Sequence, residues 1–160
     1  MAENLNYAMN PGEQSWCGGG EHKSKNEGDC SVYGRLYTWE AALRVCPEGW
    51  HLPDSTEWKT LIAAVGDEDV SGTMLKSASG WSDCGGACEK GVDAFGFSVL
   101  PAGRSCDVVF NGVGEYAYIW SAKGYSEDGA YSIMLDFDNE NAYLFHNLKR
   151  CGSSVRCLKD

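Results

Sequence analysis

Three histidines are the first residues to consider for acid–base chemistry. His22, His51 and His146 are isolated from one another along the chain. None forms an H-x-x-x-H pair, and none lies in a recognised motif with a serine or cysteine nucleophile. Because a triad would have to be assembled purely in space, we expect structural or solvent-exposed roles for all three histidines.

The cysteines carry more information than the histidines. There are eight of them: Cys17, Cys30, Cys46, Cys84, Cys88, Cys106, Cys151 and Cys157. An even number in an acidic, loop-rich chain is typical of four disulfides formed in an oxidising compartment. Zinc is the alternative, but Cys84-x3-Cys88 has no second close pair. A reactive thiol needs an electropositive setting, and only Arg150 beside Cys151 offers one, so we expect no catalytic cysteine.

Two acidic clusters could bind a cation. They are Asp67–Asp69 and the run "DFDNEN" at 136–141, which offer the oxygen ligands that calcium prefers. Neither cluster has EF-hand spacing, so we interpret them as a solvated helix end and a hairpin tip. We expect no cofactor, with calcium at the hairpin as the alternative. Paired carboxylates of the glycosidase kind depend on distance in space, and the sequence singles out no such pair.

The aromatic residues point to sugar binding more than to catalysis. Six tryptophans and eight tyrosines offer flat faces, which stack on sugar rings when amides and carboxylates flank them. Trp39, Trp50 and Trp58 lie on apolar helix faces or in a corner, so we assign them to the core. The remaining candidates lie in loops or at strand ends. We predict ligand contacts for Trp81, Asp83, Tyr116, Tyr118, Trp120, Tyr125, Asp138 and Asn139.

The first half of the chain predicts two short helices to position these residues. The first spans about 38–45, with Thr38 as its N-cap. The stretch "CPEGWHLPDSTEW" at 46–58 then turns the chain into the second helix, which Asp54 caps and Gly66 ends. Every residue of this corner except His51 has a structural role, so we do not expect an active site there.

The second half predicts loops and then an antiparallel sheet. Glycine recurs throughout 71–114, which indicates a long irregular region with a short strand at "GFSVL", 96–100. The last 45 residues carry β-prone runs, two of which are joined by the turn "DNEN" at 138–141. The predicted fold class is therefore α+β: two short helices plus an antiparallel β-sheet with long loops, stabilised by disulfides.

Length and charge narrow the class of protein. We expect a single domain over residues 1–160, long enough to bury a substantial core. The net charge of −10 disfavours nucleic acid as a partner. No apolar run is long enough for a transmembrane segment. The start "MAENLNYAMNPGEQ" has no basic or apolar signal region, so we interpret the chain as a mature form or an excised domain.

Several motifs together resemble a known family. They are "MAENLNY" at 1–7, "YGRLYTWEAA" at 33–42, "CPEGWHLPDSTEW" at 46–58, "LKSASGW" at 75–81, "FGFSVLPAGR" at 95–104, "IWSA" at 119–122 and "SVRCLKD" at 154–160. In this order, and over nearly the whole chain, they are similar to the Fibrobacter succinogenes major paralogous domain.

The resemblance implies a C-type-lectin-like fold, related to that of the formylglycine-generating enzymes. In that topology the chain ends meet, which favours Cys46–Cys157. Cys17–Cys30 is a natural local pair, and Cys84–Cys88 with Cys106–Cys151 completes the set, while crossed pairings of the last four cysteines stay open. The family usually has a strand before "MAENLNY", so an N-terminal edge strand is expected to be absent here.

The resemblance also bears on function. It implies a bacterial domain that is secreted or displayed at the cell surface, as a monomeric domain of a larger protein. With no catalytic motif, we expect a non-catalytic module for adhesion, whose partner is a carbohydrate or a cell-surface protein. Two alternatives remain: a structural or display domain without a ligand, and an enzyme on a formylglycine-generating scaffold.

Overall fold

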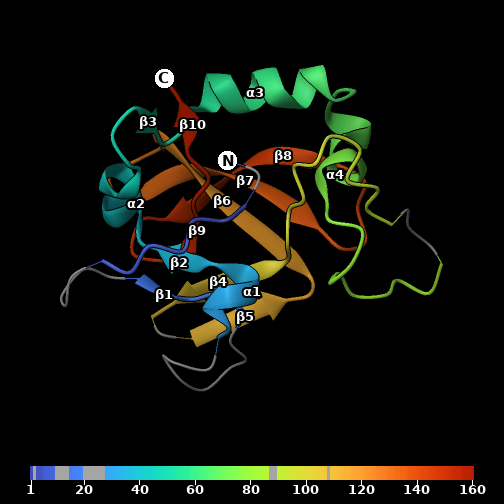
Figure 1. The fold of residues 1–160 in the computed structure, drawn as a ribbon, viewed down its shortest axis with the longest axis horizontal. Helices are drawn as coiled ribbons and strands as arrows, with labels where there is room; N and C mark the ends of the chain where they lie inside the picture. Colours follow the sequence, from blue (N-terminus) through green and yellow to red (C-terminus); the bar gives the residue numbers. More distant parts are fainter. Residues whose placement is uncertain (2, 10–14, 20–27, 87–89, 108) are drawn as a thin grey trace.

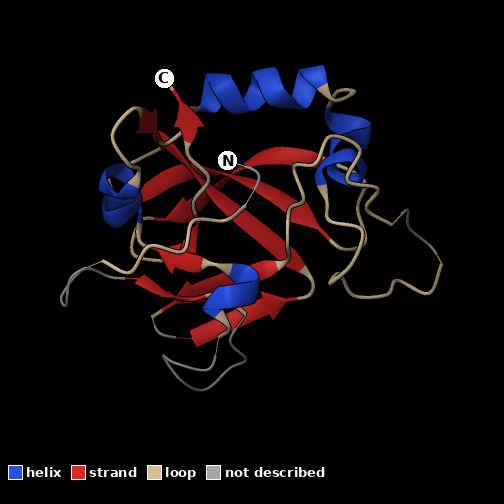
Figure 2. Ribbon diagram, in the orientation of Figure 1, coloured by secondary structure: helices blue, strands red, loops and turns tan. Residues whose placement is uncertain are grey.

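The computed structural model describes residues 1, 3–9, 15–19, 28–86, 90–107 and 109–160. These residues form an α+β structure (Figures 1 and 2). The helices are α1 (Cys30–Tyr33), α2 (Trp39–Val45), α3 (Ser55–Ala64) and α4 (Glu68–Leu75). The strands are β1 (Ser15–Cys17), β2 (Arg35–Tyr37), β3 (Trp50–His51), β4 (Ala102–Cys106), β5 (Val109–Val113), β6 (Tyr116–Gly124), β7 (Gly129–Asp136), β8 (Ala142–Leu148), β9 (Ser153–Ser154) and β10 (Leu158–Lys159).

One mixed sheet organises the molecule. Its hydrogen-bonded order is β1-β2-β9-β6-β4-β5, with β7 on the other side of β6 and β8 beyond β7. Most pairs are antiparallel, including β6–β7 and β7–β8, whereas β6 runs parallel to both β4 and β9. A second, two-stranded sheet pairs β3 with β10. The predicted hairpin at 138–141 is confirmed, since it joins β7 to β8.

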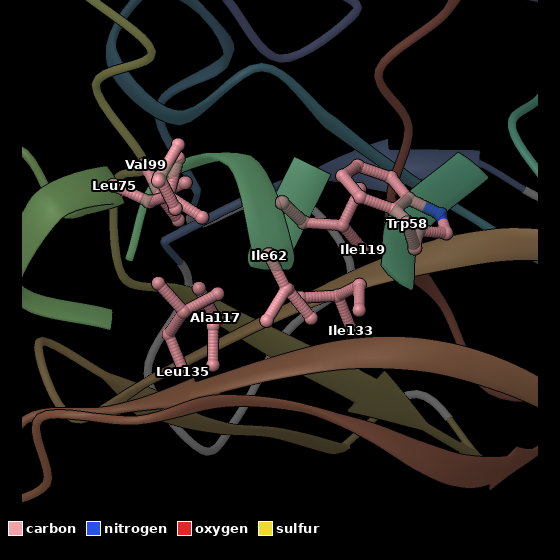
Figure 3. Packing of buried hydrophobic residues seen from close by; sticks show 10 residues of the cluster. Trp58, Ile62, Leu75, Val99, Ala117, Ile119, Ile133 and Leu135 are labelled. Atoms are coloured by element: carbon pink, nitrogen blue, oxygen red, sulfur yellow. The ribbon is translucent and has the colours of Figure 1, made fainter. Parts of the chain in front are cut away.

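Helices α3 and α4 cover one face of β6, β7 and β8 (Figure 1). Alternate residues of the strands point at them, because successive side chains of a strand face opposite ways. Trp58 and Ile62 of α3 pack there against Ile119 and Ile133 (Figure 3). The same cluster includes Leu75, Val99, Ala117 and Leu135. This packing fixes the register of the central strands.

A second cluster lies under α2 and corrects one predicted ligand residue. Trp120 is fully buried, and its indole Nε1 donates to the carbonyl oxygen of Tyr37 at 2.6 Å. It packs with Ala41 of α2 and with Val155. At this point β6 lies in the middle of the sheet and is covered on both faces, so the ligand contact predicted for Trp120 is wrong.

Both predicted helices are present. Thr38 precedes α2, and Asp54 caps α3 through a full capping box: its Oδ1 accepts from the amides of Thr56 and Glu57, and Glu57 Oε2 accepts from the amide of Asp54. Such a box satisfies amides that have no partner within the helix. Local sequence chemistry therefore determines where α3 begins, whereas the side chain of Thr38 makes no capping hydrogen bond to α2.

The middle of the chain departs from the prediction. Helix α4 and the hairpin of β4 and β5 lie in the region expected to be irregular, whereas the predicted strand at 96–100 is reduced to a single bridge between Val99 and Lys76. Glycine disfavours helices, so propensity rules do not predict a helix around Gly72. A Cβ there would lie 2.4 Å from the carbonyl oxygen of Asn141, so only glycine lets α4 approach the β7–β8 hairpin this closely.

Disulfides join Cys17–Cys30, Cys46–Cys157 and Cys106–Cys151, the pairs that the sequence analysis favoured. Cys84 is also disulfide-bonded, and its predicted partner Cys88 lies outside the described residues. In the described part of the chain, no helix is long and apolar enough to cross a membrane.

Candidate functional site

A pocket of about 290 Å³ opens where the long loop leaves α4. Two aromatic rings, several hydroxyls and charged groups line it. Its walls are Lys76, Ser77, Ala78, Ser79, Trp81, Ser82, Asp83, Cys84, Gly86, Lys90, Gly91 and Phe137. Ligand pockets are typically concave and largely apolar, with a few convergent polar groups. The pocket brings together two of the predicted ligand residues, Trp81 and Asp83.

Trp81 is held firmly at the pocket wall. Its indole Nε1 donates to Ser77 Oγ at 3.1 Å and to the carbonyl oxygen of Val99 at 3.2 Å. The ring also packs against the hydrophobic cluster beneath α3. The inward N–H anchors the side chain, so the ring itself, and not its polar group, is available to the pocket.

Lys76 lies at the base of the pocket and is almost fully buried, with 1% exposure. Its Nζ donates to the carbonyl oxygen of Asn139 at 2.5 Å and lies 5.1 Å from the centre of the Trp81 ring. Burial lowers the pKa of this amine, while the nearby carboxylates of Asp136 and Asp138 act in the opposite direction. The hydrogen bond from Lys76 thereby connects the hairpin tip to the pocket wall.

Hydrogen bonds join the hairpin to α4. The amide of Thr73 donates to the carbonyl oxygen of Glu140 at 3.1 Å, and Ser71 Oγ accepts from the amide of Ala142 at 3.1 Å. The loop that follows the pocket supplies hydrogen-bond donors for carbonyl groups at the C-terminal end of α4. The amides of Val92 and Ala94 donate to the carbonyls of residues 73 and 74. The pocket is therefore built on a helix end and a strand end.

Carboxyl and phenol groups continue the site along the same end of the sheet. Asp136 pairs with Tyr116 in the register of β6 and β7. Burial, followed by a hydrogen bond with Asp138, raises the pKa of the Asp136 carboxyl. The charge of Asp136 in turn raises the pKa of the Tyr116 phenol. The amide of Ser82 donates to the carbonyl oxygen of Gly114 at 2.7 Å, which places the pocket loop beside the turn before Tyr116.

The predicted ligand residues thus separate into groups. Trp81 and Asp83 line the pocket, Asp138 and Asn139 lie on the exposed hairpin tip next to Phe137, and Tyr116 is half-buried nearby. Tyr118 is only 6% exposed, since the guanidinium of Arg104 lies over its ring at 5.1 Å. Tyr125 lies beyond the other end of β6.

Sequence reasoning singled out only Trp81 and Asp83 of the pocket lining, and the most informative residues that it missed are Lys76 and Phe137. A single lysine in "LKSASGW" gives no sign that it is buried, because its burial depends on the hairpin that covers it. Phe137 lies within "DFDNEN", a run that composition marks only as an acidic tip. The alternation of β7, which places residue 137 just past the last core position, is the signal that was available.

Comparison with known proteins identifies the family of this chain. The family description of the Fibrobacter succinogenes major domain matches residues 1–159. This chain belongs to that family. No curated protein and no solved structure matches this chain.

In this Fibrobacter major domain, the residues that sequence reasoning considered for catalysis have structural partners. Each cysteine in the described ranges is disulfide-bonded. His51 lies between two carboxylates, with Nδ1 2.6 Å from Asp160 Oδ1 and Nε2 2.9 Å from Glu57 Oε1, and these hydrogen bonds raise its pKa. His146 stacks on aromatic rings, and His22 lies outside the described residues.

The described residues of the Fibrobacter major domain contain no group of three or more His, Cys, Asp or Glu side chains arranged to hold a metal ion. The carboxyls of Asp136 and Asp138 lie close together, but they form a pair with each other. What the pocket offers chemically is ring surface, hydroxyls, one exposed amine and the Asp83 carboxylate. These groups suit recognition of a hydroxyl-rich ligand.

Proposed function

We propose that this chain is a non-catalytic carbohydrate-binding module, which recognises sugar units in the pocket formed by Trp81 and Phe137. The observation that carries the proposal is the composition of that pocket. Two aromatic rings stand in it beside the hydroxyl groups of Ser79 and Ser82 and the carboxylate of Asp83. A sugar ring presents both apolar C–H faces and hydroxyls, so it needs this combination.

The charge of the protein supports a neutral ligand. The net charge is −10, which repels anionic polymers at a distance. The ammonium of Lys76 is already bonded to Asn139 and leaves Lys90 as the exposed amine of the described lining. We therefore propose neutral polysaccharides as the ligand class, in preference to polyuronates or a surface protein.

The setting of the module is part of the proposal. Three disulfides support export to an oxidising compartment, at the cell surface or outside the cell. The α+β topology, with a long connection between α4 and β4, supports a relation to the C-type-lectin-like fold. We propose that residues 1–160 act as one such domain in a larger adhesive protein.

The test is a retention assay on a panel of insoluble and immobilised polysaccharides, neutral and acidic, run with calcium and with a chelator. The proposal expects retention on at least one neutral polysaccharide, and release by its soluble oligosaccharides. Loss of retention in the presence of the chelator would show that the binding site contains a calcium ion. No retention on any member of the panel under either condition would reject the proposal in favour of a display domain without a ligand.

A further inference from the structure

A second aromatic surface lies at the opposite end of the sheet from the pocket. The ring of Tyr125 stacks on His146, with 4.6 Å between centroids and 16° between planes, and His146 in turn stacks on Phe145 at 5.4 Å and 11°. Tyr131 supports Tyr125 edge-on at 5.3 Å. Tyr125 is nevertheless 54% exposed, so a ring braced on one side presents its surface to solvent on the other.

The turn that carries Tyr125 is well ordered by hydrogen bonds. The amides of Tyr125 and Ser126 both donate to the carbonyl oxygen of Gly129, at 2.9 and 3.0 Å. Lys149 holds the rest of the turn, since its Nζ donates to the carbonyl oxygen of Glu127 and its amide to that of Asp128. A rigid ring loses little conformational entropy when a ligand stacks on it.

The surroundings favour a neutral, hydroxyl-bearing ligand. Strand β8 forms the edge of the sheet, and between Ala142 and Leu148 it carries no carboxylate, lysine or arginine. Glu127 and Asp128 follow Tyr125 in the same turn, and their exposed carboxylates can accept hydrogen bonds from hydroxyl groups. Quaternary ammonium ligands are instead recognised by several ring faces that enclose them. Here the Tyr125 ring has one open face, and the neighbouring rings support it from the other side.

We infer that Tyr125 is the platform of a second saccharide-binding surface, which stacks on a sugar unit of the same neutral polysaccharide that the pocket recognises. The ligand class rests on the proposed function, whereas the surface rests on the ring stack. Tyr125 lies just before β7 and Phe137 just after it. Eight residues of strand separate the two surfaces by roughly 25 Å.

This separation determines the kind of ligand that benefits. A disaccharide cannot reach both surfaces, whereas a long chain, or neighbouring chains in an insoluble polymer, can engage them together. Simultaneous contact converts the second binding event into an intramolecular one and raises the overall affinity. The surface thus specifies polymeric over oligomeric carbohydrate.

The experiment compares retention on insoluble cellulose, xylan and chitin with calorimetric binding of their tetrasaccharides. The variants are Tyr125→Ala, Tyr125→Phe and, as a matched control, Tyr7→Ala, which removes a tyrosine that is 63% exposed. We expect Tyr125→Ala to weaken retention on the polymer at least tenfold while tetrasaccharide affinity stays within twofold. Tyr125→Phe and Tyr7→Ala should retain polymer binding.

Two other results have distinct meanings. If Tyr125→Ala binds the polymer as the unaltered protein does, or loses tetrasaccharide affinity to the same degree, the second surface is rejected and the proposed function stands. If the unaltered protein binds none of the three polymers and none of their tetrasaccharides, the ligand class is rejected, and with it both proposals.

Discussion

Arg156 Nε donates to Asn4 Oδ1 at 2.9 Å and so joins the first and last motifs of the chain. The guanidinium is 2% exposed and also donates to the carbonyl oxygens of Phe97 and Ser98. Burial lowers its pKa to about 10. The amide of Asn4 donates in turn to the carbonyl oxygen of Tyr33. One buried cation therefore holds three segments that are distant in sequence.

Replacing Asn4 should destabilise the fold. Asn4→Ala leaves the buried Nε of Arg156 and the carbonyl of Tyr33 without this partner, and an unsatisfied buried group costs about 1–3 kcal/mol. Urea unfolding measures the loss. Asn6→Ala is the control: Asn6 is exposed, and its substitution should change stability by less than about 0.5 kcal/mol. Equal effects of the two changes would contradict the role given to Asn4.

Gly72 should not tolerate a side chain. Gly72→Ala improves helix propensity by about 1 kcal/mol, yet its Cβ would lie 2.4–2.5 Å from backbone oxygens of the hairpin. We expect a net destabilisation of about 1–3 kcal/mol. We also expect weaker ligand binding, because two pocket residues, Lys76 and Phe137, directly follow α4 and β7. Gly124→Ala is the control, since its Cβ would meet only Trp39 at 3.8 Å. A stabilised Gly72→Ala variant would show that the hairpin can move away.

The raised pKa of Asp136 predicts a pH-dependent effect of its removal. A carboxyl whose pKa is higher in the folded state favours folding while it is protonated, and this contribution is lost as the pH rises through the folded pKa. Asp136→Asn should therefore stabilise the protein at pH 7, and the gain should disappear below about pH 4, near the unfolded value. Urea unfolding across this range measures it, with the exposed Asp128→Asn as control. A gain that is unchanged at pH 3 would show that the effect is not ionisation.

The disulfides should differ in their contributions. Cys46–Cys157 closes a loop with a sequence separation of 111, and Cys17–Cys30 one of 13. The chain-entropy relation gives about 4–5 kcal/mol for the first and about 3 kcal/mol for the second. Paired serine variants should follow this order in urea unfolding. A larger loss from the Cys17–Cys30 pair would indicate that native contacts around α1 outweigh loop entropy.

The sequence predicts most of what depends on local chemistry. The capping box of Asp54 and the hairpin of β7 and β8 are examples, since turn and cap residues act within a few positions. Helix α4 could not be predicted, because Gly72 serves a contact with a segment about seventy residues away. The burial of Trp120 could not be predicted either, because it depends on the central position of β6 in the sheet and so on contacts with distant segments.

The candidate site divides in the same way. Trp81 and Asp83 are close in sequence and were predicted together, and both line the pocket. Lys76 directly follows α4 and Phe137 directly follows β7, and only the tertiary structure brings them to the same pocket. Tyr125 was predicted as a ligand residue, but the stack on His146 that braces it arises from pairing between β7 and β8.

The central claim is that the pocket at Phe137 binds a saccharide. The most direct measurement is the affinity of Phe137→Leu for the soluble oligosaccharide that releases the protein in the retention assay. Loss of one stacking ring should weaken binding about tenfold, which corresponds to about 1.4 kcal/mol. The matched variant Phe95→Leu, which alters a ring that is 62% exposed and outside the pocket lining, should bind as the unaltered protein does. Equal affinities for Phe137→Leu, Phe95→Leu and the unaltered protein would contradict the account.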